Sequence, residues 1–405
     1  MRRPYAAKKC DPVKCFVGRN CQCPDIGHAM EYFDKPNMPQ FILLTFDDAL
    51  ADTLYDNFYK PVMQDMGLVS KNTGCPIRGT FFLSHEFTNY VMVNEMANLG
   101  NEIALHTVTH GTRYSNDGKL LNGNEVMKHM TKQDWLNELQ GNLKYINTFA
   151  NISKDSIKGV RAPFLQTSGN PTYEAFMRMN LTYDSSLSNA KPSWPYRMTF
   201  KQKECQVPPC PDKAFHMWQI PLSNWLGLGK VACPMFDSCY FGTTRKEAYK
   251  VIKDNFARFA QHKAPFPIFL HPAMLLNNPH VRSALIQFLD EMTNEEDVHF
   301  ITMSELIEFM EMGNGKVPVQ KKEFAKYMTK KCAIPIQEAI CEGYSTCNYN
   351  NFNDTVVMCN EKCPGELPLL ENYHTLSFLE EEEASYLRTG ISSKSQSDGE
   401  LFSVF

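Results

Sequence analysis

The sequence predicts an α/β fold, a distorted (β/α) barrel with disulfide-stapled loop segments at its N- and C-terminal ends. Between residues 39 and 312, short apolar runs alternate with stretches of helical periodicity, as repeated strand–helix units require. Cysteines gather on both sides of this region, in segments without regular periodicity, which indicates covalent cross-links. We therefore divide the chain into a Cys-rich segment packed on the barrel (1–38), the barrel (39–312), a second Cys-rich segment (313–372) and a mobile acidic and Ser-rich tail (373–405).

Eight apolar runs have the length and the aromatic or β-branched content of buried parallel strands. They cover residues 41–46, 80–83, 102–106, 159–163, 181–185, 216–222, 267–271 and 298–303. Residues 184–216 are polar and Pro-rich, so we expect a surface excursion there that contains Cys205 and Cys210.

Four stretches have the periodicity of helices that bury one face against a sheet. They cover residues 131–149, 244–260, 280–292 and 303–312. In the first, apolar residues recur three or four positions apart, at Trp135, Leu139, Leu143 and Ile146. We expect Ser304 to be the N-cap of the last.

The 14 cysteines of the 405 residues indicate a disulfide framework and an oxidising, extracellular compartment. A cytosolic zinc-binding protein is the weaker alternative, because no two CxxC motifs have zinc-ribbon spacing. Cys75 has no neighbouring cysteine, so we expect a distant partner, and we expect the bridges to tie the Cys-rich ends to the barrel. Three N-glycosylation sequons agree with secretion, at Asn151, Asn180 and Asn353.

Charge and hydropathy exclude two classes of partner. The net charge of −4 gives no basic excess for nucleic acid, and no apolar run reaches the length of a membrane span. No signal peptide is visible after Met1, so we interpret the sequence as a mature or engineered form of a secreted chain. We expect a monomer.

Four short motifs carry the residue types of a hydrolytic metal site, and each follows a predicted strand. TFDDA contains the adjacent carboxylates Asp47 and Asp48, whose mutual repulsion a bound cation removes. HTVTH places His106 and His110 four residues apart; two histidines and one carboxylate leave an open position on zinc. RAPF supplies Arg161 to orient a carboxylate, and LHP supplies His271 as a proton donor.

Each motif also has a simpler interpretation. These are an exposed acidic turn, a chance histidine pair on a surface helix, a surface arginine and a structural histidine. Their shared placement favours function, because catalytic groups of α/β barrels lie at the carboxyl ends of the strands. We therefore expect these side chains to converge on one face.

The order TFDDA, HTVTH, RAPF and LHP resembles the motif pattern of NodB-homology polysaccharide deacetylases over residues 39–312. The segments GVRAPFLQTSGN, YDSSLSN and CPMFDSC are similar to those of animal, arthropod-type chitin deacetylases. The resemblance implies that Asp47 is the catalytic base and His271 the catalytic acid. It further implies that a divalent metal, Zn²⁺ above all, binds Asp48, His106 and His110.

The same resemblance assigns four substrate or transition-state residues. Arg161 orients an active-site carboxylate, and Phe164 replaces the family's tyrosine while keeping a backbone N–H for the oxyanion. Asp184 is expected to tune His271, and Trp218 is either a sugar platform or an aromatic of the barrel wall.

The implied activity is metal-dependent removal of N-acetyl groups from chitin or chito-oligosaccharides in a chitinous matrix such as cuticle or gut lining. Two alternatives remain. One is the same chemistry on peptidoglycan or xylan, and the other is a matrix protein that binds chitin without turnover.

Overall fold

The computed structural model describes residues 5–11, 13–15, 21–24, 37–115, 118–201, 205–312, 320–333, 339–349 and 354–365. The predicted tail and the sequon at Asn353 lie outside these residues.

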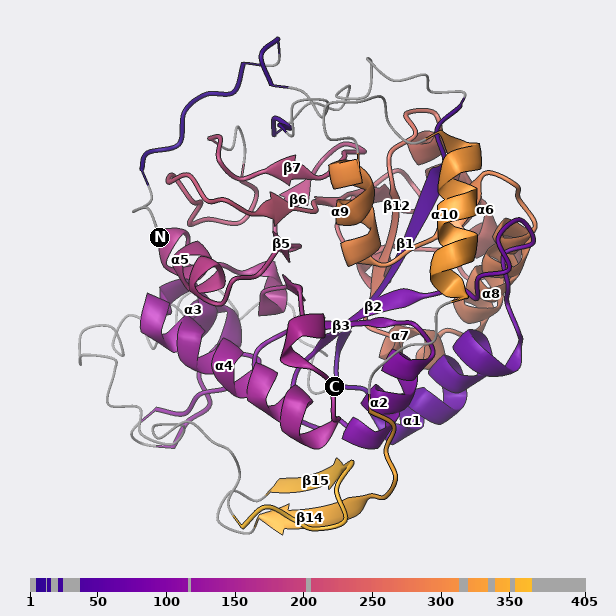
Figure 1. Ribbon diagram of the computed structural model, residues 1–405. Helices are drawn as coiled ribbons and strands as arrows, with labels where there is room; N and C mark the ends of the chain where they lie inside the picture. Colours follow the sequence, from indigo (N-terminus) through magenta and orange to yellow (C-terminus); the bar gives the residue numbers. More distant parts are fainter. Residues whose placement is uncertain are drawn as a thin grey trace.

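A curled, mainly parallel sheet forms the centre of the molecule (Figure 1). Its order is β12-β1-β2-β3-β4-β5-β8-β7, with β7 antiparallel to β8 and with β13 paired to the start of β1. Within the described chain, no pairing joins β12 to β7, so the predicted barrel is an open half-barrel. The strands are β1 (Gln40–Asp48), β2 (Gly79–Leu83), β3 (Glu102–Leu105), β4 (Gly159–Val160), β5 (Tyr183–Asp184), β7 (Tyr196–Arg197), β8 (Trp218–Gln219), β12 (Phe266–Leu270) and β13 (Val298–Phe300).

All eight predicted strands are present, several of them shorter than expected. Three two-stranded sheets that the pattern did not predict lie outside the central one. They pair β6 (Ser188–Asn189) with β9 (Leu222–Ser223), β10 (Trp225–Leu226) with β11 (Ala232–Cys233), and β14 (Ser345–Tyr349) with β15 (Asp354–Met358).

Helices surround the sheet (Figure 1), and the four predicted ones are among them. The α-helices of the described residues are α1 (Asp52–Leu54), α2 (Tyr90–Asn98), α3 (Gly123–His129), α4 (Lys132–Phe149), α5 (Asn170–Arg178), α6 (Arg245–Ala260), α7 (Ala273–Asn277), α8 (Pro279–Thr293), α9 (Met303–Met312) and α10 (Lys321–Cys332); the predicted ones are α4, α6, α8 and α9. Two π-helical turns, Tyr55–Tyr59 and Pro61–Asp65, follow α1. None of the described helices combines the length and the apolar character of a membrane span.

Side chains cap the N-termini of the predicted helices α4 and α9, and at α9 the capping residue is not the predicted one. Thr131 caps α4 in a reciprocal capping box with Asp134. At α9, the prediction that Ser304 is the N-cap is wrong. Thr302 accepts from the Glu305 N–H at 3.3 Å and donates its own N–H to the Glu305 carboxylate at 2.9 Å. Ser304 lies within the helix.

The core is built on the apolar strands and does not depend on the polar strand ends. Phe46 of β1 is 1% exposed and packs against Tyr59 and Phe81, with ring centroids 5.0 and 4.9 Å away. Full burial of one such side chain contributes about 1.5–3 kcal/mol. This apolar packing does not involve the histidines that follow the strands, so their substitution should leave the fold largely intact.

All 14 cysteines form disulfides, which confirms the predicted framework. Cys75 pairs with Cys332, 257 residues away, as its isolation predicted. The other six bridges are local, so the expectation that many bridges tie the ends to the barrel is wrong: one does. These local bridges are Cys10–Cys23, Cys15–Cys21, Cys205–Cys210, Cys233–Cys239, Cys341–Cys359 and Cys347–Cys363.

The second Cys-rich segment contains regular structure as well as loops. Helix α10 was not predicted because only Phe324 and Met328 mark its buried face, among several lysines. The hairpin β14–β15 lies at the edge of the molecule beyond α2 and α4 (Figure 1). It is attached by a 2.7 Å contact between His85 Nε2 and Asp354, and by the Cys359 N–H, which donates to the Phe149 carbonyl.

Candidate active site

Five polar side chains lie at the carboxyl ends of four strands of the central sheet, β12, β1, β3 and β4, with β2 between β1 and β3. Asp47 and Asp48 end β1, His106 follows β3, Arg161 follows β4 and His271 follows β12. Parallel strands end at the same edge of the sheet, and this edge carries the active sites of α/β barrels. The structure therefore brings together residues separated by more than 200 positions in the sequence.

Asp48, His106 and His110 form a candidate metal centre. One ligand atom from each lies within 4.8 Å of the others. The Nε2 atoms of His106 and His110 are 3.4 and 3.1 Å from Asp48 Oδ1. Asp48 Oδ1 and His110 Nε2 are buried, and although they lie close together neither forms a hydrogen bond within the described part of the chain, an arrangement that a cation between them would satisfy. Two imidazoles and one carboxylate fit a zinc ion with an open coordination position.

The tautomer of His106 is fixed by the strand next to it. Its Nδ1 lies 2.8 Å from the Arg161 carbonyl oxygen, which can only accept, so Nδ1 carries the proton. In the neutral ring, Nε2 is then the nitrogen with a free lone pair, and it faces Asp48. A hydrogen bond of this kind orients metal-binding histidines generally.

The backbone around the metal centre is held in an unusual conformation. Asp48, Thr107 and His110 have φ values of 77°, 70° and 51°, in the left-handed region that favours glycine. The His110 N–H donates to the Thr107 hydroxyl at 3.2 Å, which stabilises the turn between them. Such conformations persist where the surrounding structure enforces them, and they are concentrated at functional sites.

Asp47 forms a buried ion pair with Arg161. The Asp47 Oδ1 accepts from Arg161 Nη1 at 2.5 Å, and the arginine is fully buried. The guanidinium lies over the rings of Phe82 and Phe269 and also donates to the Ser185 carbonyl at 2.8 Å. A fully paired guanidinium fixes the orientation of the carboxylate that it binds.

His271 is oriented by Asp237, a residue that the sequence analysis did not single out. Asp237 lies 2.9 Å from His271 Nδ1 and accepts from the His271 backbone N–H at 3.1 Å. Burial lowers the pKa of His271, but the carboxylates of Asp237, Asp48 and Asp47 together outweigh burial, with Asp237 contributing most, and the pKa rises to about 10. The His271 Nε2 faces the metal centre, 3.7 Å from Asp48 Oδ2.

The expectation that Asp184 tunes His271 is therefore wrong, because Asp237 occupies that place. Asp184 is fully buried, and burial raises its pKa to about 6. It accepts a hydrogen bond from the Ser186 hydroxyl, which in turn accepts from the Ala162 N–H at 2.8 Å. Asp184 thus supports the backbone of the RAPF loop from behind.

Trp218 belongs to the barrel wall, and the sugar-platform interpretation is wrong. The side chain is 1% exposed. The Arg197 guanidinium covers one ring face at 3.8 Å, and the indole N–H donates to Glu311 at 2.9 Å. Its ring faces are therefore not available to a sugar.

Phe164 flanks the metal centre. Its ring makes an edge contact with the His110 ring, with centroids 4.6 Å apart, and the residue is 47% exposed. It has a left-handed φ of 56°. The side chain forms an apolar wall where a tyrosine would add a hydroxyl group.

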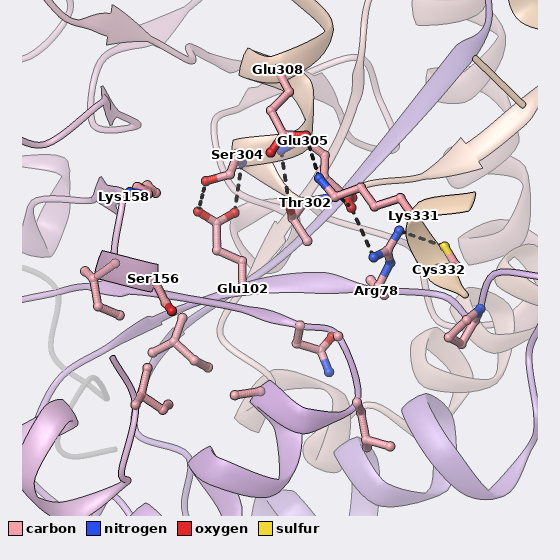
Figure 2. A pocket seen from close by; sticks show the side chains of 18 residues that line it. Arg78, Glu102, Ser156, Lys158, Thr302, Ser304, Glu305, Glu308, Lys331 and Cys332 are labelled. Atoms are coloured by element: carbon pink, nitrogen blue, oxygen red, sulfur yellow. Dashed lines mark hydrogen bonds and ion pairs between the residues drawn. The ribbon is translucent and has the colours of Figure 1, made fainter. Parts of the chain in front are cut away.

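A cavity of about 510 Å³ lies at the opposite end of the strands (Figure 2). Its wall includes Arg78, which precedes β2, Glu102, which begins β3, and Lys158, which precedes β4. Several of its charged groups pair with one another, as Arg78 does with Glu305 at 3.0 Å. The amino-terminal end of such sheets serves stability, so we place the active site at the other end.

Comparisons with known proteins find relatives of this chain, although no family model matches it. Chitin deacetylase 8 of Bombyx mori is 30% identical over 383 residues, which cover 90% of this chain and 93% of that protein. Chitin deacetylase 1 of Bombyx mori is 31% identical over 350 residues, covering 82% of this chain and 61% of the relative. A solved structure, the catalytic domain of a peptidoglycan N-acetylglucosamine deacetylase from Eubacterium rectale, has 13% identity and a TM-score of 0.36, covering 66% of this chain and 90% of that one.

Proposed function

This chain belongs to the chitin deacetylase family, and from that premise we propose that it removes acetyl groups from chitin at the site described above. The observation that carries the proposal is the arrangement around Asp48. Among the described residues, Asp48 Oδ1 and His110 Nε2 have no hydrogen-bond partner, while Asp47 and His271 are each held next to Asp48 by a charged residue. This arrangement combines a metal centre, a base and an acid.

In the proposed reaction, Asp48, His106 and His110 would hold a zinc ion. When bound there, the ion would supply a Lewis acid for the acetyl carbonyl and lower the pKa of a bound water. Asp47 accepts the proton of the attacking water, since Arg161 fixes its carboxylate and leaves the second oxygen to act. The Phe164 backbone N–H donates to the carbonyl oxygen as negative charge develops on it. His271 gives its proton to the departing amine, and acetate is the second product.

The substrate is tested by acetate release from chitin oligomers, acetylated xylan and peptidoglycan fragments under identical conditions. We expect release from the chitin oligomers above all. Preferential release from either other polymer would change the substrate and keep the chemistry. Binding to insoluble chitin without release from any polymer would leave a matrix-binding protein.

The metal centre should be necessary for activity and nearly dispensable for the fold. Replacing His106 or His110 with alanine should remove bound zinc and acetate release, while the melting temperature changes by only a few degrees. Zinc content by mass spectrometry and calorimetry on the same samples test this. The control is His280→Ala. His280 lies on α8, where its Nε2 contacts the Gly242 carbonyl at 3.2 Å, so this variant should keep its zinc. Full activity in a zinc-free variant would refute the site.

Asp237 should set the alkaline limit of activity. Asn at this position removes the charge that raises the pKa of His271, so His271 loses its proton at a lower pH. Because the acid must be protonated to donate, the alkaline limb of the kcat profile should move to lower pH. Zinc content should not change. An unmoved limb would mean that His271 is not the acid.

The protein is further proposed to be a secreted monomer that acts in a chitinous matrix. Seven disulfides among the described residues support an oxidising compartment. Asn180 is exposed and available to a glycan, whereas the Asn151 side-chain amide donates to the Cys359 carbonyl at 3.2 Å. Glycan mapping on the secreted protein tests both asparagines.

A further inference from the structure

We infer that Glu138 of α4 is a positioning residue that holds the two histidines of the loop 106–110 at the separation a metal requires. The inference rests on the proposed function, since it assumes that His106 and His110 bind the metal. Glu138 touches neither histidine side chain in the described contacts. It binds the two residues of the loop that lie immediately before His110.

The Glu138 carboxylate is fully used by this loop. Its Oε2 accepts from the Val108 and Thr109 backbone N–H groups, at 3.0 and 2.9 Å. Its Oε1 accepts from the Thr109 hydroxyl at 2.8 Å and from Arg113 Nη2 at 2.5 Å. All four donors lie between positions 108 and 113, so one side chain determines the path of the loop.

Burial makes these hydrogen bonds consequential. Glu138 is 1% exposed, and a buried carboxylate is tolerated only when it is paired and hydrogen-bonded. Arg113 supplies the positive charge, and its Nη1 also donates to the Thr109 hydroxyl at 2.6 Å. Removal of the carboxylate would leave two backbone N–H groups without their partner in a site closed to water.

The same face of α4 holds the start of the loop. Asn142, one turn after Glu138, accepts from the His106 N–H at 3.1 Å. Helix α4 therefore holds His106 directly and His110 through the residue before it. The side chains of positions 138 and 142 share one helix face because residues four apart lie one above the other.

The conformation of the loop explains why it needs this support. Thr107 and His110, on either side of the two N–H groups that Glu138 binds, both have left-handed φ values, of 70° and 51°. Neither residue is glycine, so each conformation costs free energy that other contacts must offset. Without Glu138 we expect the loop to relax and to move His110 away from His106.

The experiment measures zinc affinity directly, by competition of the metal-free protein with a chromophoric chelator. Glu138→Ala should weaken zinc binding by about 10- to 100-fold, as loss of such supporting contacts commonly does. Glu138→Gln should restore part of the affinity, because its amide oxygen can still accept from both backbone N–H groups, whereas its NH2 group cannot accept from Arg113. The matched control is Leu139→Ala, a fully buried neighbour on the same helix, which should lower the melting temperature and leave zinc affinity unchanged.

The outcomes separate this inference from the proposed function. If His110→Ala loses zinc and Glu138→Ala binds it as the unsubstituted chain does, Glu138 is not a positioning residue. Equal loss of affinity in Leu139→Ala would likewise overturn the inference, since general destabilisation would then explain the result. If His110→Ala keeps its zinc, the proposed metal centre is wrong. Should Glu138→Ala fail to fold, Glu138→Asp replaces it, because the shorter carboxylate keeps its charge but cannot reach both N–H groups.

Discussion

Replacing Asp47 with asparagine is expected to leave zinc bound and to lower the rate of deacetylation by about 10²–10⁴-fold, the usual contribution of a general base. The side chain of Asp47 binds Arg161 and is 3% exposed, whereas the metal ligands gather around Asp48. An asparagine amide retains the shape of the carboxylate but cannot accept the proton of water. Acetate release and zinc content, measured on the same preparation, test both halves of this result.

The Asp48→Asn variant is the matched partner of this experiment, because the two residues are adjacent and chemically identical. A neutral amide is a poorer zinc ligand than a carboxylate, so this variant should lose zinc as well as activity. Zinc loss from Asp47→Asn with retention in Asp48→Asn would reverse the assigned roles. Full activity in both variants would make the pair a structural acidic turn.

Replacing both Cys75 and Cys332 with serine is expected to lower the free energy of unfolding by about 5.5 kcal/mol, the chain-entropy value for a loop of this length. This bridge spans 257 residues and joins the segment before β2 to the end of α10. The Cys205→Ser/Cys210→Ser variant is the control, since that bridge spans 5 residues and the same relation gives about 2 kcal/mol. Denaturant unfolding under non-reducing conditions measures both.

Equal losses in the two disulfide variants would show that loop length does not determine the stabilisation. Free-thiol counting on the unreduced protein provides an independent check of the framework. Fourteen reactive thiols, in place of seven bridges, would refute both the pairing and the oxidising compartment.

The sequence predicted the fold well because the central strands are short and apolar and because stretches of helical periodicity separate many of them. It also placed the polar residues at strand ends, since each of their motifs directly follows an apolar run. The pattern could not reveal Asp237, which lies in the turn between Cys233 and Cys239, where no periodicity marks which side chain faces the site. The feature of the sequence that could have marked Asp237 is that it is the carboxylate residue between Cys233 and Cys239.

The role of a side chain was predicted poorly where the sequence allowed it either to face the site or to pack in the wall of the barrel. Composition could not decide whether Trp218 faces the cleft or the wall, because the deciding contacts come from Arg197 and Glu311, which are distant in sequence. Glu138 was not recognised for a related reason. In the sequence, Glu138 is indistinguishable from the solvent-facing polar residues of an amphipathic helix. Its role follows only from its contacts with the loop 106–110.

The left-handed backbone at Thr107 and His110 has a consequence for directed evolution of this protein. Glycine or asparagine adopts that conformation more readily than threonine or histidine, so a library screened only for heat resistance should accept such replacements. The same replacements remove the Thr107 hydroxyl that accepts from the His110 N–H, or the imidazole itself. A screen for thermostable variants should therefore select for retained zinc in the same step. Otherwise it will enrich stable proteins that no longer bind zinc or release acetate.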